Sequence, residues 1–261
     1  MLKKLTLIGL IFFFSNGLTQ GQVLLSLIFG DNLNTEKLEF GMSAGYNMSY
    51  IRGIEGSIGQ HNWELGFYFD IHPNLESPFH IATGVYVKSN VGGRKIPLDY
   101  PGNREVKDSI YNGFDAAHGS VEKRFNTFYV PINLRYMTKA GIFIEGGAQV
   151  GLVFKTTDIY QADVEGYPLN YEITKKIKDN GLYKWFDGGV NGGIGYQTKG
   201  SLGWKIGVWY YLGLTNIYKN DLGPKAYNSS LYVLATIPIG KRKAAEMRAK
   251  KAAEKEAAGG M

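Results

Sequence analysis

The feature that most constrains this chain is a period-two alternation of apolar and polar side chains, repeated in segments of about ten residues. In the first segment, 38–50, Leu38 and Phe40 alternate with Glu39 and Gly41. Successive side chains of a strand point to opposite faces, so each such segment has one apolar face and one face of Gly, Ser, Asn and charged residues. The other segments are 62–71, 79–88, 130–136, 142–154, 186–198, 202–211 and 230–239.

The polar face of these segments is too rich in Gly, Asn, Glu and Lys to form a hydrophobic core, which favours an apolar face directed at lipid. Lipid offers no partner to an unpaired backbone group, so a sheet in a bilayer must close on itself. We therefore predict an all-β fold, a closed antiparallel up-and-down transmembrane β-barrel of about eight strands. Periodicity alone does not fix which face points inward, so a soluble sandwich or lipocalin-like barrel remains the alternative.

The expected connections alternate in length. Short turns are predicted at 73–78, 138–141 and 198–201, and longer loops at 89–124, 155–184 and 215–227. Bacterial barrels combine short periplasmic turns with longer external loops. An even number of strands then places both termini in the periplasm, and the expected location is the bacterial outer membrane.

Four segments are expected along the chain: a signal peptide at 1–21, a periplasmic N-terminal segment at 22–36, the barrel at 37–240, and a charged periplasmic tail at 241–261. Lys3 and Lys4 precede an apolar run that is too short for a membrane-spanning helix. A second apolar run at 23–29 leaves an uncleaved anchor as an alternative. The composition of the tail predicts a short, solvated helix that is a candidate contact for an envelope partner.

The net charge of +6 lies outside the expected barrel. Lys3 and Lys4 contribute +2, and the tail contributes +4 through seven Lys or Arg and three Glu, which leaves a neutral body. A nucleic-acid partner is therefore not expected. The absence of cysteine excludes a disulfide scaffold and a thiolate metal site.

Charged side chains on the polar faces form the first candidate site. In the predicted strands 130–136 and 142–154, the turn between them brings Arg135 and Glu145 nearly opposite each other. We interpret the set as ion pairs that fill a narrow lumen, and the alternative is a path for protons, ions or small polar solutes. The expected lumen charges are Glu64, Asp70, Arg135, Glu145, Asp187 and Lys205.

Aromatic residues near the ends of the expected strands form the second candidate site, a pair of girdles at the two membrane interfaces. One girdle contains Tyr50, Trp63, Phe154, Phe186 and Tyr210, and the other contains Tyr136, Tyr196 and Trp204.

Further aromatics lie in the expected external loops, where they would contact an envelope partner or pack loop against loop. They are Tyr100, Tyr111, Phe114, Tyr160, Tyr167 and Tyr171. Ser109, within Asp108-Ser109-Ile110, resembles a short O-glycosylation signal.

Nothing in the sequence predicts catalysis or a cofactor. Of the four histidines, His61 is the nearest to a carboxylate, but three residues along a strand place it and Glu64 on opposite faces. No metal-ligand spacing occurs, and the paired glycines at 188–189 and 192–193 lack the helix that a phosphate-binding loop requires. No catalytic residue, metal or cofactor is expected, although a barrel enzyme remains a minor alternative.

Four stretches resemble the PorT-like outer-membrane β-barrel family of Bacteroidetes-type bacteria: 22–31, 129–136, 144–151 and 213–220. The resemblance covers nearly the whole expected mature chain and makes Pro131 a family feature. It implies an outer-membrane barrel and, for some members, association with a secretion and gliding apparatus. It does not imply one activity, because fold and function separate readily. The long second loop and the charged tail depart from the simple pattern of the family.

Overall fold

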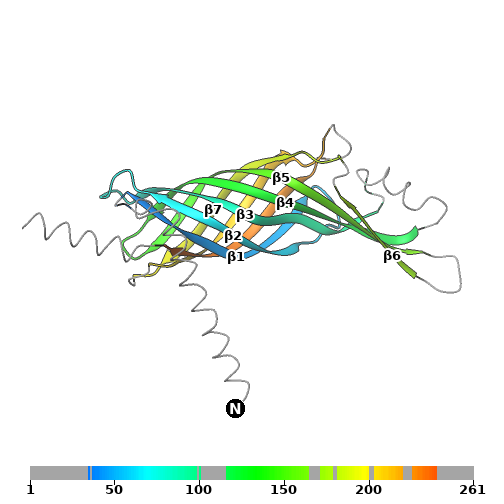
Figure 1. The fold of residues 1–261 in the computed structure, drawn as a ribbon, viewed down its shortest axis with the longest axis horizontal. Coiled ribbons are helices and arrows are strands. Elements are labelled where there is room, and N and C mark those ends of the chain that lie inside the picture. Colours follow the sequence, from blue (N-terminus) through cyan, green and yellow to red (C-terminus); the bar gives the residue numbers. More distant parts are fainter. Residues whose placement is uncertain are drawn as a thin grey trace, which may run out of the picture.

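The period-two segments form antiparallel strands, and eight of these close into a ring (Figure 1). The ring runs β1-β2-β3-β4-β5-β7-β8-β9 and is closed by the pairing of β9 with β1, while β6 pairs with β5 outside it. The strands are β1 (Leu38–Arg52), β2 (Gln60–Ile71), β3 (Phe79–Pro97), β4 (Ala116–Met137), β5 (Ile142–Val164), β6 (Tyr171–Lys178), β7 (Phe186–Gln197), β8 (Lys205–Asn216) and β9 (Tyr227–Pro238). The prediction of eight ring strands is confirmed.

The structure is a computed structural model that describes residues 35, 37–98, 100, 116–164, 171–178, 181–199, 203–219 and 225–239. The expected signal peptide at 1–21, nearly all of 22–36, and the tail at 241–261 lie outside these residues. Within them, no helix has the length and apolar character needed to cross a membrane.

The two ends of the ring differ. The strand ends that are joined by residues 72–78, 138–141 and 198–204 lie at one end, called here the short-turn end. At the opposite end, called the extended end, β3, β4 and β5 run on beyond their neighbours and β6 adds a further strand (Figure 1). Both β1 and β9 have their outer chain ends at the short-turn end, because β1 starts there and β9 finishes there.

Burial alternates along the ring strands with the predicted period. On β4, Asn133 and Arg135 are buried, whereas Ile132 and Leu134 are each 58% exposed. On β8, the inward-facing Trp209 and Tyr211 alternate with the exposed Val208 and Tyr210. The polar and aromatic faces thus form the interior, and the apolar band expected to face lipid lies outside.

Two of the predicted long loops are wrong. β3 continues to Pro97 and β4 begins at Ala116, so much of the predicted loop 89–124 is strand. β5 continues to Val164 and β6 occupies part of the predicted loop 155–184. These strands run past the apolar band, so their outer faces no longer need to be apolar. Without that alternation, the sequence signal for a membrane strand disappears.

Strict alternation along the segment 79–88 predicts that Lys88 points inward, on the same side as Tyr86. This prediction is wrong, because Lys88 is exposed and pairs with the outward-facing Leu65. The register between β3 and β4 shifts between Tyr86 and Ser89, and an irregularity of this kind inverts the faces of the residues beyond it.

Glycines on the inner face make room for large rings. A Cβ atom at Gly193 would overlap the indole of Trp209, and one at Gly195 would overlap the ring of Phe143. The adjacent Gly192 points outward, where a Cβ would meet only the backbone oxygen of Glu145, at 3.4 Å. Neighbouring glycines of β7 therefore have different roles.

We expect Gly193→Val to destabilise the folded barrel by about 1–3 kcal/mol, because the added methyl groups overpack the interior against Trp209. Gly192→Val is the matched control and should change the free energy of unfolding by less than about 0.5 kcal/mol. Urea unfolding in detergent micelles measures both. Equal losses of unfolding free energy in the two variants would contradict the conclusion that Gly193 makes room for Trp209.

Candidate functional site

A layer of ion pairs crosses the interior near the short-turn end. Arg135 of β4 is at its centre: Nη1 donates to both carboxylate oxygens of Asp70 on β2, at 2.9 and 2.7 Å. Nε of Arg135 donates to Glu145, its register partner on β5. The guanidinium also lies over the ring of Phe143, 4.4 Å from its centroid. Both carboxylates and the guanidinium are almost completely shielded from solvent.

Lys205 of β8 extends this layer to the other side of the ring. Its ammonium pairs with Asp70 and with Glu39 of β1. The hydroxyl of Tyr68 donates to the same Glu39 oxygen at 2.9 Å, and the Lys205 ammonium lies 4.6 Å from the Tyr68 ring centroid. Glu39 was not among the predicted lumen charges, although its place on the polar face of the first segment could have identified it.

The ion-pair layer, comprising Glu39, Asp70, Arg135, Glu145 and Lys205, therefore draws side chains from five ring strands. Arg135 and Glu145 are on adjacent strands, but the pairs of Asp70 with Arg135 and with Lys205 join non-adjacent strands. These contacts are made across the lumen, which the layer consequently fills. Asp70 joins both cations, and Glu145 accepts further hydrogen bonds from Asn133 Nδ2 (2.9 Å) and Trp209 Nε1 (2.6 Å). Shared partners of this kind satisfy buried charges that would otherwise be costly.

Two predicted lumen charges are buried but do not join this layer. Glu64 accepts hydrogen bonds from the hydroxyls of Tyr129 and Ser89. Asp187 accepts one from Asn228 Nδ2 at 3.0 Å. The hydrogen-bond donors to Glu64 and Asp187 are neutral groups. The sequence predicted that these carboxylates face the lumen, but it did not reveal which inward-facing carboxylates pair with a cation.

A cavity of about 40 Å³ lies between the ion-pair layer and the middle of the barrel. Arg135, Glu145 and Gln149 are among the residues that line it, together with Asn191 and Trp209. This is room for a few water molecules at most, since each needs roughly 10–15 Å³ of space measured in this way.

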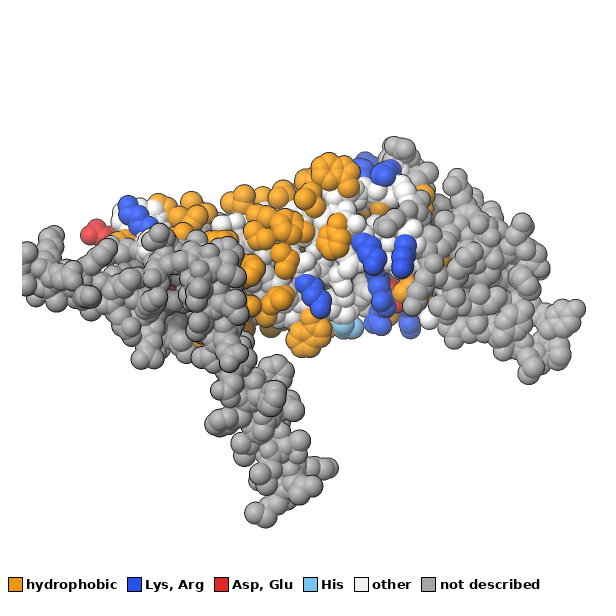
Figure 2. Space-filling view, in the orientation of Figure 1, with side chains coloured by type: hydrophobic (Ala, Val, Ile, Leu, Met, Phe, Trp, Pro, Cys, Tyr) orange, Lys and Arg blue, Asp and Glu red, His pale blue; other side chains and the backbone are white. Residues whose placement is uncertain are grey.

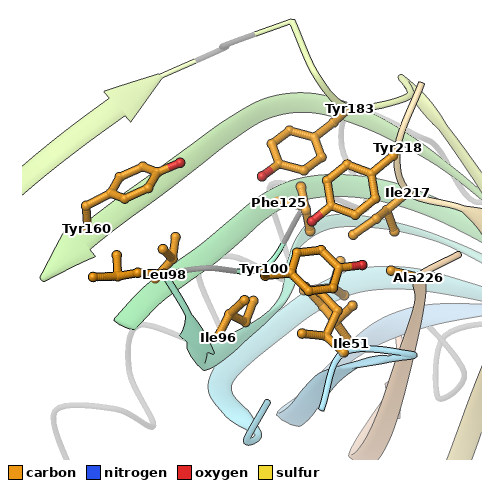
Figure 3. Close-up of a cluster of buried hydrophobic side chains, with 13 residues drawn as sticks. Ile51, Ile96, Leu98, Tyr100, Phe125, Tyr160, Tyr183, Ile217, Tyr218 and Ala226 are labelled. Carbon is orange, nitrogen blue, oxygen red and sulfur yellow. The ribbon is translucent and has the colours of Figure 1, made fainter. Parts of the chain in front are cut away.

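At the extended end, a second layer of apolar and tyrosine side chains fills the interior (Figure 3). This cap combines residues from opposite sides of the ring, such as Ile51 on β1 and Tyr160 on β5. Its members are Ile51, Ile54, Val91, Ile96, Leu98, Tyr100, Val121, Phe125, Tyr160, Tyr183, Ile217, Tyr218 and Ala226.

A buried ion pair is enclosed beside the cap. Lys123 Nζ lies 3.4 Å from Asp158 Oδ2, and neither side chain is exposed. Lys123 also donates to the Tyr183 hydroxyl at 2.6 Å, and Tyr183 donates to Asp158 at 2.6 Å. Burial, with the Asp158 carboxylate beside it, raises the pKa of Tyr183 well above its ordinary value, so the phenol stays protonated and donates. These contacts hold the loop residue Tyr183 over the lumen.

The prediction that Tyr160 lies in a loop is wrong, whereas Tyr100 lies outside the strands and follows the packing alternative. Tyr160 is a fully buried residue of β5, and Tyr100 stacks on Tyr218 with ring centroids 6.1 Å apart. Both belong to the cap. Side chains of Ser109, Tyr111, Phe114, Tyr167 and Tyr171 lie outside the described residues.

The predicted girdle residues are on the outer surface. Trp63 and Phe154 are the most exposed of them, at 74% and 63%, and the Tyr50 and Tyr210 hydroxyls contact each other. Tyr136 of the other set contacts Phe79, with ring centroids 5.3 Å apart. Trp185, which is 68% exposed and touches Phe186 edge-on, was missed because the alternation begins one residue later.

Within the described residues, no group of His, Asp and Glu could hold a metal ion. His61 contacts the Tyr46 hydroxyl on the outer face, away from the buried Glu64. His72 and His80 lie ring to ring, with centroids 3.9 Å apart. These contacts do not assemble a Ser–His–carboxylate arrangement.

Comparison with known proteins gives one family match. A family model described as outer membrane protein beta-barrel domain matches residues 29–219, most of the chain. The sequence matches no curated protein significantly. The family match supports the outer-membrane part of the expected resemblance, while the finer PorT-like assignment remains a prediction.

Several solved structures of small outer-membrane barrels are similar to this chain. The attachment invasion locus protein Ail of Yersinia pestis is 11% identical with a TM-score of 0.39, over 78% of this chain and 99% of Ail. Neisserial surface protein A is 10% identical with a TM-score of 0.34, over 76% and 96% of the two chains. OprG from Pseudomonas aeruginosa is 12% identical with a TM-score of 0.31, over 78% and 97%. The family assignment rests on the match to residues 29–219.

We expect Arg135→Met to lower the free energy of unfolding by about 3–5 kcal/mol, because Asp70 and Glu145 would lose a shared buried cation. Arg124→Met is the matched control: its guanidinium pairs with Glu122 at 2.6 Å, but its side chain is 50% exposed. The control should cost less than about 1 kcal/mol. Urea unfolding in micelles distinguishes the two, and similar losses would show that the ion-pair layer does not depend on Arg135.

Proposed function

The chain belongs to the outer membrane protein beta-barrel domain family, and from this premise we propose that it is a closed, non-enzymatic barrel of the bacterial outer membrane. Its role would be structural, or accessory to an envelope or secretion assembly. The observation that carries the proposal is that the interior is filled at two levels. The ion-pair layer crosses it near the short-turn end, and the cap crosses it at the extended end.

Each layer opposes transport for a different physical reason. The carboxylates of the ion-pair layer already have cations and hydrogen-bond donors, so a passing ion would have to break charge-assisted bonds. The cap is mostly aromatic and aliphatic surface, where the desolvation of an ion is costly. A ring of about eight strands also has space for little beyond its own side chains.

The proposed orientation places both termini and the short turns in the periplasm and the extended end outside the cell. Short periplasmic turns and larger external connections are usual in such barrels. In this orientation, the extended sheet of β4, β5 and β6 is the surface available to an envelope partner, with the tail as a second contact on the periplasmic side. The resemblance to PorT-like barrels favours an accessory role.

A narrow channel for protons, ions or small polar solutes is the second candidate. Two observations favour it: the cavity of about 40 Å³, and the buried side-chain carbonyl oxygens of Asn133 and Asn191, which have no hydrogen-bond partner among the residues that the structure describes. Water molecules in that cavity would satisfy such oxygens. The cap still separates the cavity from the extended end.

Planar-bilayer conductance tests the proposal. We expect the purified wild-type protein to produce no discrete current steps, because both layers must open before ions pass. A porin reconstituted in the same way is the positive control for insertion. The folded state is checked independently by the shift in gel mobility on boiling.

Current steps in the wild type that change in Glu145→Gln would overturn the closed-barrel proposal and support the channel. Glu122→Gln is the matched control, since Glu122 pairs with Arg124 away from the ion-pair layer. A change of the current steps in both variants would indicate a surface-charge effect on conductance. That result would also contradict a barrel that conducts no ions.

A further inference from the structure

Four cationic side chains lie together on the outer face of β3–β6, just beyond the apolar band. They are Lys88, Arg124, Lys155 and Lys178, all of them exposed. Figure 2 shows Lys and Arg side chains gathered on this side of the molecule beside the hydrophobic band, toward the extended end. The four residues are called here the basic patch.

Strand register places the members of the basic patch beside one another. Arg124 on β4 pairs with Thr157 on β5, which in turn pairs with Lys178 on β6. Lys155 pairs with Asn126, two residues from Arg124 on the same face. Asn126 also pairs with Asn90 on β3, two residues from Lys88. Neighbouring strands lie about 4.8 Å apart, so flexible side chains at these positions reach a common ligand.

The charge of the basic patch is only partly compensated. Glu122 pairs with Arg124 and also accepts a hydrogen bond from Gln60 at 2.7 Å. Among the described residues, Lys88, Lys155 and Lys178 take part in no salt bridge. An excess of mobile, solvated cations on one face attracts anions, and guanidinium and ammonium groups form strong charge-assisted hydrogen bonds with phosphate.

The neighbours of the basic patch indicate what kind of anion fits. On the barrel side it adjoins exposed apolar side chains, including Val87 beside Lys88 and Leu152 and Phe154 beside Lys155. A ligand seated here would place an anionic group on the cations and an apolar portion along the band. That division matches a lipid whose phosphate lies at the membrane interface and whose acyl chains run along the barrel wall.

We propose that the basic patch is a binding site for phosphate-bearing head groups of net negative charge, on lipids in the leaflet at the extended end. The inference rests on the proposed membrane location and names a ligand class for this outer face. The site holds annular lipid against the base of the β4–β6 extension. Its strength falls with rising salt, because solvated charges are screened.

Native mass spectrometry of the detergent-solubilised full-length protein tests the site. The probes are phosphatidic acid and phosphatidylcholine with identical acyl chains, which differ in net head-group charge. We expect the wild type to retain phosphatidic acid with a dissociation constant at least roughly ten-fold below that of phosphatidylcholine. Added sodium chloride should bring the two dissociation constants closer together, because it screens the charges.

The test variant is the triple substitution Lys88→Gln, Arg124→Gln and Lys155→Gln, which removes three charges from the basic patch. The matched control removes three charges from exposed lysines at the short-turn end, through Lys37→Gln, Lys139→Gln and Lys199→Gln. We expect the patch variant to lose at least roughly ten-fold in affinity for phosphatidic acid and the control to keep it.

Equal affinities of the wild type for the two lipids, or equal losses in the two triple variants, would overturn the proposed site. Every sample is first checked for the mobility shift on boiling, so a failure of lipid selectivity in a folded barrel is distinguishable from a failure to form the barrel. Current steps from the same preparation would contradict the closed-barrel function without bearing on lipid selectivity.

Discussion

Complete pairing of the backbone is the constraint on which the rest of this structure depends. A bilayer supplies no hydrogen-bond partner to a strand edge, so the sheet must meet itself, and here β9 pairs with β1 from Gly41↔Pro238 to Arg52↔Tyr227. A ring of eight strands encloses a narrow lumen. Every inward-facing side chain must then share that lumen with side chains from the opposite wall.

The narrow lumen explains why large and charged side chains occur in the barrel interior next to glycines. Trp209 and Phe143 occupy the space that Gly193 and Gly195 leave, and the ring of Phe143 in turn lies under the Arg135 guanidinium. Charges remain inside because each is surrounded by partners from several strands. The same geometry that closes the backbone thus brings together the ion-pair layer, and removing one shared cation would leave carboxylates buried without compensation.

The outer surface beyond the apolar band differs in polarity from the middle of the barrel, because only the middle is expected to contact lipid. Beyond the apolar band, β4 and β5 keep their backbone pairing, but their outer faces become polar and basic. Inside that extension, Lys123 and Asp158 contact each other and Tyr183 of the cap. The extended end is therefore sealed within and charged on its outer surface, which suits it to contacts with lipid head groups or envelope partners.

By itself, the sequence determined the barrel. Period-two alternation identifies the eight ring strands, and the short turn at 138–141 is sufficient to place Arg135 opposite Glu145. The tertiary structure decided what that alternation cannot encode. Contacts across the lumen, such as Lys205 with Asp70, depend on ring closure and on the stagger of distant strands. Tyr160 became part of the cap because its strand continues where lipid no longer imposes a pattern, so local sequence carries no signal for its burial.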